Sequence, residues 1–109
     1  MYRFSLEQNE QILKKGTASL HVDRDVFAGA LYLTNERLVF VGYVHGVNTK
    51  YDKAFSLKQI KEIKPTKTLL IIPNAFVITI NDNEQFELIV HGRNEWLEAI
   101  RVRMTALPA

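Results

Sequence analysis

The sequence contains no cysteine and no apolar run of membrane-spanning length. Without cysteine the chain has no disulfide, thiol nucleophile or thiolate metal site, and nothing points to an oxidising compartment. The longest apolar run, residues 69–73, is far shorter than the roughly 20 residues that a spanning helix needs. The first seven residues turn polar and acidic where a secretory signal peptide would be apolar. These absences predict a cytoplasmic protein with no transmembrane segment.

The sequence also lacks the patterns that most catalytic and metal sites require. Its three histidines, His21, His45 and His91, are isolated, and no pair has the spacing of ligands on a helix. The five glycines are too scattered to form a phosphate-binding loop, and no serine lies in a glycine-flanked nucleophile elbow. We therefore expect no enzyme activity, no metal and no cofactor, and we interpret the histidines as ordinary surface residues.

The residues that are present fit one globular domain. Of the 109 residues, 47% are hydrophobic and 24% are charged, which is ordinary for a folded domain. At this length a core can form without a disulfide or a metal. We expect a single domain over residues 1–109, with a core from about residue 10 to residue 104 and no internal repeat or linker.

Residues 29–43 carry the strongest structural signal. Two runs rich in β-branched and aromatic residues meet at Asn35-Glu36, and asparagine suits the left-handed backbone of a two-residue hairpin turn. Because both faces of this ribbon are largely apolar, we expect it inside a curled sheet. The predicted opposing pairs are Leu33–Leu38 and Leu31–Phe40 on one face, and Tyr32–Val39 and Ala30–Val41 on the other.

Other segments give weaker predictions. Alternating apolar residues indicate strands at residues 17–22, 54–57, 75–80 and 86–90. Residues 5–15 begin with a possible capping box, Ser5 with Gln8, and are expected to form one or two helical turns. In residues 57–64 the apolar side chains and the lysines both recur every three positions, as in a short amphipathic helix. Pro65 and the neighbouring strand signals favour instead a strand that ends, kinks near residues 59–60 and restarts at residue 62.

Two further features complete the expected fold. Residues 69–72 fit either a buried strand or an exposed edge that pairs with a partner strand. A helix should begin at Gly92 or Asn94, with Trp96 on its apolar stripe as the residue that plugs the core. About seven short strands and one helix cannot bury a flat sheet. The predicted fold is mainly β: a partly open barrel or orthogonal sandwich of the pleckstrin-homology type, capped by one C-terminal α-helix.

The order and spacing of several segments resemble the GRAM domain, a family of the pleckstrin-homology superfold. The matching segments are residues 29–34, 37–40, 57–60 and 72–75, the last being Ile-Pro-Asn-Ala followed by a strand, and the resemblance runs from about Glu10 to Ile100. It implies a non-catalytic module that associates with membranes, through phosphoinositides or phosphatidylserine, or that serves as a protein-interaction surface. The chain looks like the small free-standing versions that occur in bacteria.

One departure from the family bears on the ligand. Inositol-phosphate binders of this family commonly take lysines and arginines from the connection between the first two strands. That connection here is Asp23-Arg24-Asp25. Two carboxylates beside one arginine repel a polyphosphate headgroup, so we do not expect a specific phosphoinositide site there.

The net charge of +2 is unevenly distributed along the chain. Residues 1–49 and 68–109 carry charges of 0 and −2, whereas residues 50–67 carry +4, from six lysines and two acids. Such lysines either keep sheet edges soluble or attract an anionic membrane, at about 1 kcal/mol for each basic residue near the lipid. Nucleic acid is not expected, because the arginines are scattered and +4 is a slight charge. The candidate lipid- or anion-binding residues are Lys50, Lys53, Lys58, Lys61, Lys64 and Lys67.

Two hypotheses of function follow. The first is reversible, peripheral association with anionic lipid headgroups or with a membrane-associated protein, helped by apolar insertion from Tyr43, Val44, Val47 or Tyr51. The alternative is a protein-interaction or self-association module, such as a homodimer, that uses an exposed sheet edge without binding lipid.

Overall fold

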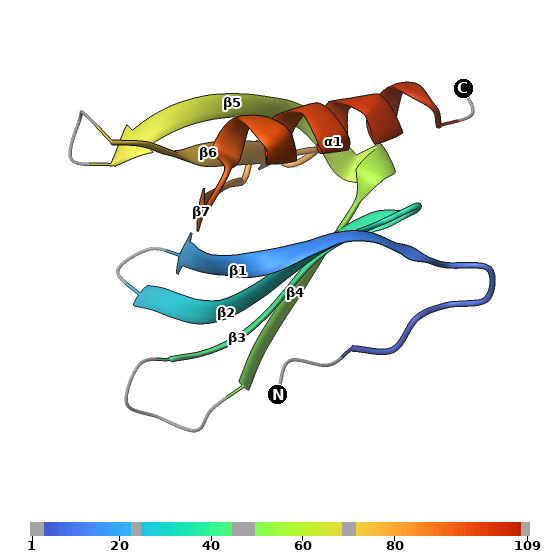
Figure 1. Cartoon of the computed structure of the whole chain (residues 1–109), viewed down its shortest axis with the longest axis horizontal. Helices are drawn as coiled ribbons and strands as arrows, with labels where there is room; N and C mark the ends of the chain where they lie inside the picture. Colours follow the sequence, from blue (N-terminus) through green and yellow to red (C-terminus); the bar gives the residue numbers. More distant parts are fainter. Residues whose placement is uncertain (1–3, 23–24, 45–49, 69–71, 108–109) are drawn as a thin grey trace.

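The computed structural model describes residues 4–22, 25–44, 50–68 and 72–107. It contains seven strands followed by one helix, as the sequence predicted (Figure 1). The strands are β1 (Ile12–Val22), β2 (Asp25–Thr34), β3 (Arg37–Val44), β4 (Lys50–Ser56), β5 (Ile60–Thr68), β6 (Ile72–Ile80) and β7 (Gln85–Val90). A single 3₁₀ turn, η1 (Leu57–Gln59), joins β4 to β5, and α1 (Arg93–Thr105) ends the fold.

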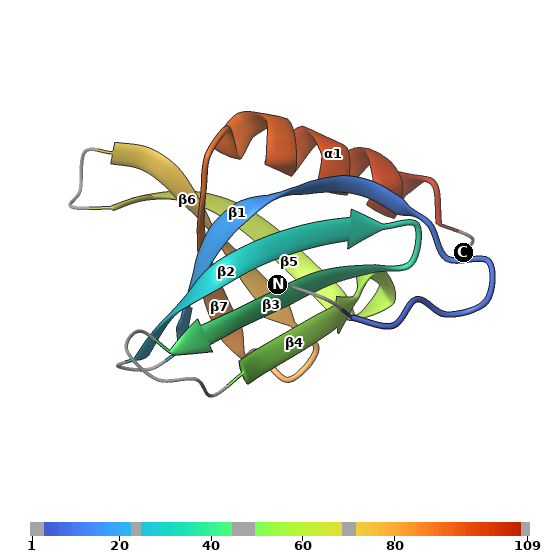
Figure 2. The ribbon, with the colours of Figure 1, turned by 60° about the horizontal axis from the view of Figure 1, so that its bottom comes forward.

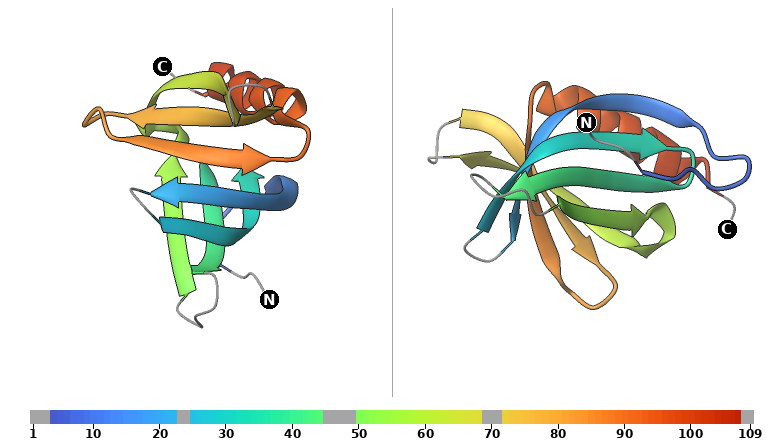
Figure 3. Two further views of the ribbon diagram at one scale, coloured as in Figure 1. Left: turned by 90° about the vertical axis from the view of Figure 1, so that its left-hand side faces the viewer. Right: turned by 90° about the horizontal axis from the view of Figure 1, so that it is seen from below.

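All seven strands belong to one antiparallel sheet in the order β4-β3-β2-β1-β7-β6-β5. The sheet consists of two meanders, β1 to β4 and β5 to β7, and among the described residues these are paired only between β1 and β7. In Figure 1 the two meanders form two layers, with α1 beside the upper one, and the views in Figure 3 show the sheet curling between them. This is the partly open barrel of the pleckstrin-homology type that the sequence predicted.

The β2–β3 hairpin has the predicted register, with Leu33 opposite Leu38 and Leu31 opposite Phe40. The predicted backbone of its turn is wrong. Among the described residues other than glycine, only Asn9 and Asn83 have a positive φ, at 66° and 65°. Side-chain hydrogen bonds hold the turn instead. The Thr34 hydroxyl oxygen accepts from the backbone N–H of residue 36 at 3.0 Å and from that of residue 37 at 2.9 Å.

Residues 5–15 do not form the expected helical turns. A turn spans Gln8 and Asn9, and β1 has already begun at Ile12, which pairs with Thr34 of β2. The Asn35 side chain ties this segment to the hairpin, since its Oδ1 accepts from the Gln11 N–H at 2.8 Å and its Nδ2 donates to the Asn9 carbonyl at 3.1 Å. Strand pairing and tertiary hydrogen bonds therefore prevail over the local capping box.

The structure supports the strand interpretation of residues 57–64. β4 ends at Ser56, η1 makes one turn, and β5 starts at Ile60 with an irregular register between Ile60 and Glu62. The 3₁₀ turn, with three residues per turn, accounts for the spacing from residue 57 to 60, and the extra residue of the bulge accounts for the spacing from residue 60 to 63. Residues 69–71 lie outside the described residues, so the two interpretations of that run stay open.

Helix α1 covers the open end of the sheet with one apolar face, as predicted. Trp96, Leu97 and Ile100 are buried in the core cluster with side chains from both meanders. Gly16 of β1 lies under the indole ring, because a Cβ at that position would be 3.3 Å from Trp96. The Lys14 ammonium lies 5.0 Å from the centre of the same ring, a cation–π distance. Trp96 is therefore the plug residue of the core.

Candidate functional site

All six candidate lysines lie on β4, on η1 or on β5. β4 and β5 are the two edge strands of the sheet, and they diverge from η1 into different layers (Figure 1). The structure therefore distributes the lysines along a bent path that follows both edges. It does not bring the six together into one compact patch.

The two lysines of β4 are engaged with other side chains. The Lys50 ammonium lies 3.5 Å from a carboxylate oxygen of Asp52. The half-buried Lys53 points toward aromatic rings, with its ammonium 5.0 Å from the centre of the Phe86 ring and 5.8 Å from that of Phe55. Lys53 thus lies at cation–π distance from aromatic side chains of β4 and β7.

The structure also bears on the apolar side chains that were expected to insert into a membrane. Tyr51 stacks on Phe27, with ring centres 4.1 Å apart, so this side chain belongs to the wall of the barrel. Its burial, with a smaller contribution from Glu84, raises the pKa of the Tyr51 hydroxyl. The expected contribution of Val47 falls outside the described residues.

Four lysines of η1 and β5 form an exposed basic edge, which we call the β5 edge. Glu62 is the only acidic residue in residues 57–68, so this segment carries +3 (four lysines minus one acid). The Lys61 ammonium donates to Asn83 Oδ1 at 2.8 Å, and within the described residues no ion pair neutralises the four lysines. The β5 edge consists of Lys58, Lys61, Lys64 and Lys67.

A buried ion pair lies at the start of β3, next to the β2–β3 turn. Arg37 donates from Nε and Nη2 to the two carboxylate oxygens of Glu10, each at 2.8 Å. The Thr34 hydroxyl donates to the same carboxylate at 2.6 Å, and the Glu7 N–H donates at 2.9 Å. The side chain of Glu10 is 0% exposed and that of Arg37 is 20% exposed. The Arg37 hydrogen bonds hold the pKa of Glu10 at about 2, below its ordinary value of 4.5, although burial opposes this effect.

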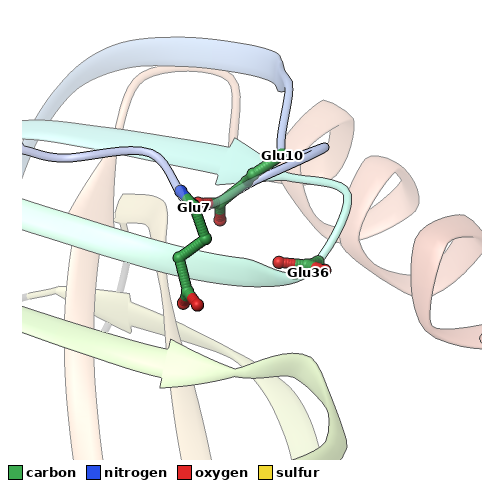
Figure 4. A group of neighbouring side chains, drawn as sticks. All are labelled: Glu7, Glu10 and Glu36. Atoms are coloured by element: carbon green, nitrogen blue, oxygen red, sulfur yellow. The ribbon is translucent and has the colours of Figure 1, made fainter.

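Two further carboxylates lie beside this pair. The acidic groups of Glu7, Glu10 and Glu36 gather around the β2–β3 turn, with oxygens within 4.8 Å of one another (Figure 4). The Arg37 guanidinium already supplies the positive charge there, because it binds both oxygens of Glu10. We therefore interpret the cluster as a clamp that fixes residues 5–10 on the hairpin. The cluster could not be predicted from the sequence, because Glu10 and Arg37 are 27 residues apart and no local pattern links them.

A second surface feature is an apolar groove of about 470 Å³ between the start of β1 and the outer side of α1. These two elements lie side by side in Figures 1 and 2. Two of the lining side chains are apolar and largely exposed, Leu13 at 51% and Val102 at 62%. Val102 lies off the apolar stripe of α1, so helical periodicity alone could have identified it as an exposed apolar residue. The groove, which we call the β1–α1 groove, is lined by Leu13, Lys14, Leu33, Ala99, Val102, Arg103 and Ala106.

A match to one family model shows the family to which the chain belongs. The model of the GRAM domain family matches residues 1–101. The chain belongs to the GRAM domain family. This GRAM domain has no match among curated protein sequences.

Three solved structures similar to this GRAM domain have the same fold. The C-terminal domain of an unknown protein from Leishmania infantum has a TM-score of 0.73 and 18% identity, over 88% of this chain and 85% of that one. The Vps36 N-terminal PH domain has a TM-score of 0.71 and 11% identity, over 93% and 83%. The hSac2 domain from the human phosphoinositide phosphatase Sac2 has a TM-score of 0.69 and 14% identity, over 95% and 76%. At these identities the likeness shows the fold alone.

The remaining sequence candidates are scattered over this GRAM domain. His21 Nδ1 lies 3.3 Å from a Glu87 oxygen, His91 is exposed after β7, and His45 lies outside the described residues. Of the connection between the first two strands, the structure describes only Asp25, which is exposed at the start of β2. In the parts of the chain that the structure covers, no helix has the length and apolar character needed to cross a bilayer.

Proposed function

We propose that this GRAM domain binds reversibly to anionic membrane surfaces through the β5 edge. The observation that carries the proposal is a group of four exposed lysines with a single acid among them, one on η1 and three on β5, a strand that has only one neighbour in the sheet. Membership of the GRAM family supports a binding module for lipid or protein in general.

The expected binding is weak and depends on salt. A strand rises about 3.3 Å per residue, so the three lysines of β5, from Lys61 to Lys67, extend over roughly 20 Å, and Lys58 precedes them on η1. Each basic residue near an anionic surface contributes about 1 kcal/mol, which gives about 3–4 kcal/mol for the whole edge. The Debye length falls to about 8 Å at physiological salt, so screening reduces this attraction further. Such a domain would leave the membrane readily.

The same residues bear on the alternative, strand addition or self-association at a sheet edge. Lysines lie on both edge strands, and Pro65 lies within β5. Charged side chains and proline on an edge strand oppose pairing with another strand. We therefore favour the lipid surface over a partner strand as the ligand of the β5 edge.

The test is co-sedimentation with vesicles of phosphatidylcholine alone or with added phosphatidylserine, at low and near-physiological salt. The wild type should sediment only with the anionic vesicles and less at higher salt. The variant Lys61→Glu/Lys64→Glu should bind at least about tenfold more weakly, because it loses two lysines at about 1 kcal/mol each. Lys15→Glu/Arg101→Glu is the matched control, with the same change of charge at exposed positions on β1 and α1. No binding at low salt, or an equal loss in both variants, contradicts the proposal.

A further inference from the structure

We propose that the β1–α1 groove binds an acidic amphipathic segment of a partner protein. This second surface is built from residues outside the β5 edge, so the proposal does not depend on membrane binding. It rests on three features of the groove: an apolar residue turned outward by a bulge, an exposed apolar residue on α1, and a rim of fixed positive charge.

A β-bulge in β1 turns Leu13 outward. Ile12 pairs with Thr34 and Lys14 pairs with Leu33, so Leu13 is the extra residue between two consecutive partners on β2. A bulge of this kind redirects a side chain away from the regular alternation of the strand. Leu13 is left 51% exposed at the start of β1, just before the regular pairing with β2 begins at Lys14. The bulge thus supplies one wall of the groove.

Helix α1 supplies the other wall. Its core-facing side is buried, whereas Val102 on the outer side is 62% exposed. The small side chains of Ala99 and Ala106 flank Val102 along the helix, and Leu33 is buried at the base of the groove. Small residues beside larger ones leave a concave apolar surface, which can receive one or two large apolar side chains.

The charge of the groove selects the kind of partner. Its charged lining residues are Lys14 and Arg103, and none of the lining residues is acidic. Both cations are held in place: Lys14 lies over the Trp96 ring, and the Arg103 Nε donates to the Asn35 carbonyl at 3.0 Å. The exposed Lys15 lines an adjoining hollow with Leu13. An apolar groove with a basic rim is complementary to apolar side chains flanked by aspartate or glutamate.

Other occupants fit less well. A second copy docked about a two-fold axis would place Lys14 and Arg103 against the same cations of its partner, which is unfavourable. A bilayer surface is flat on this scale and contacts protruding residues, whereas Leu33 lies at the base of a concave site. A peptide side chain reaches that base.

The test is selection of random 12-residue peptides displayed on phage against the wild-type protein, with counter-selection on Leu13→Ser/Val102→Ser. Both residues are exposed, so this variant should fold, and its thermal unfolding is checked. Enriched peptides should combine apolar residues with aspartate or glutamate and should bind the counter-selected variant at least tenfold more weakly. Replacing their acidic residues with lysine should abolish binding. The control is Val26→Ser/Ile72→Ser, which removes two apolar residues of similar exposure, 46% and 41%, elsewhere and should bind as the wild type does.

Four results would overturn the proposal. The first three are that no peptide is enriched, that the enriched peptides lack acidic residues, and that the peptides bind both serine variants with equal affinity. The fourth is that the only defect of Leu13→Ser/Val102→Ser is the loss of phosphatidylserine-vesicle binding or of a dimer. The last result would assign the groove to lipid or to a second copy. Because the peptide selection uses no membrane, its outcome is separate from that of the vesicle experiment.

Discussion

At the scale of single residues, the Glu10–Arg37 pair fixes the chain that precedes β1. Arg37 also donates from Nη2 to the Ser5 carbonyl at 2.7 Å, so one guanidinium holds two points of the N-terminal segment. The pair is close to fully desolvated on the Glu10 side. Removing one member of a buried pair leaves the other charge without its partner, which is strongly destabilising.

Replacing Glu10 with glutamine should reduce the free energy of unfolding by about 3 kcal/mol at pH 7. The folded-state pKa of Glu10, about 2, lies below its ordinary 4.5, so the unfolded chain binds more protons between these values. The stability from this group is therefore complete above about pH 4.5 and is lost as the pH falls toward 2. One pKa unit corresponds to about 1.4 kcal/mol, so the wild type should lose roughly 3 kcal/mol in this interval that Glu10→Gln does not lose.

Denaturant unfolding at pH 7, 4 and 3 measures this difference. Glu7→Gln is the control, because Glu7 is exposed and contributes to the cluster without being buried. If both variants had the same dependence on pH as the wild type, the Arg37 pair would not be the source of acid sensitivity.

The side-chain pairs of the hairpin were predictable from the sequence, whereas the polar contacts between distant residues were not. The opposing pairs of the β2–β3 hairpin follow from alternation and from one turn position, which the sequence shows directly. The position of Lys53 over Phe86 depends on how β4 meets β7 in the folded barrel, and nothing near residue 53 indicates it. The same holds for Glu10, whose partners come from a different hairpin.

At the scale of elements, α1 is attached through one face only. Trp96 fills the space over Gly16, whereas Val102 faces outward from the same helix. Trp96→Ala should lower the free energy of unfolding by about 3–5 kcal/mol, because it leaves a cavity between α1 and β1. Val102→Ala should change it by less than about 0.5 kcal/mol. Denaturant unfolding followed by circular dichroism measures both, and similar losses in the two variants would contradict this arrangement of the helix.

The elements themselves were largely predictable, with one exception. Strands with clear alternation and the terminal helix with its apolar stripe were read from local periodicity. Residues 5–15 have the local signature of a helix start, but the β1–β2 pairing extends to Ile12 and uses that backbone for strand hydrogen bonds. The bulge at Leu13, which shapes the β1–α1 groove, depends on the same strand pairing and therefore could not be predicted from the sequence either.

At the scale of the whole molecule, the sequence showed which segment carries the excess of positive charge. It did not show that the fold divides this charge between two separate edge strands. The lysines lie close together in the chain, yet the topology places β4 and β5 at opposite ends of the sheet order. The β5 edge keeps four exposed lysines on the consecutive elements η1 and β5. The predicted fold could be derived from the order of elements, whereas the shape of a charged surface depends on strand positions that only the three-dimensional structure supplies.

The pairing of β1 with β7 has a consequence for the rate at which the chain folds. Neighbouring strands within each meander close short loops, but Ala18 and Val90 pair across more than half of the chain. Contacts of such long sequence separation are costly to form and should appear late. Val90→Ala should therefore speed unfolding and leave the folding rate nearly unchanged, whereas Leu38→Ala in the local hairpin should slow folding. Stopped-flow kinetics would show whether the two meanders form first and the barrel closes last.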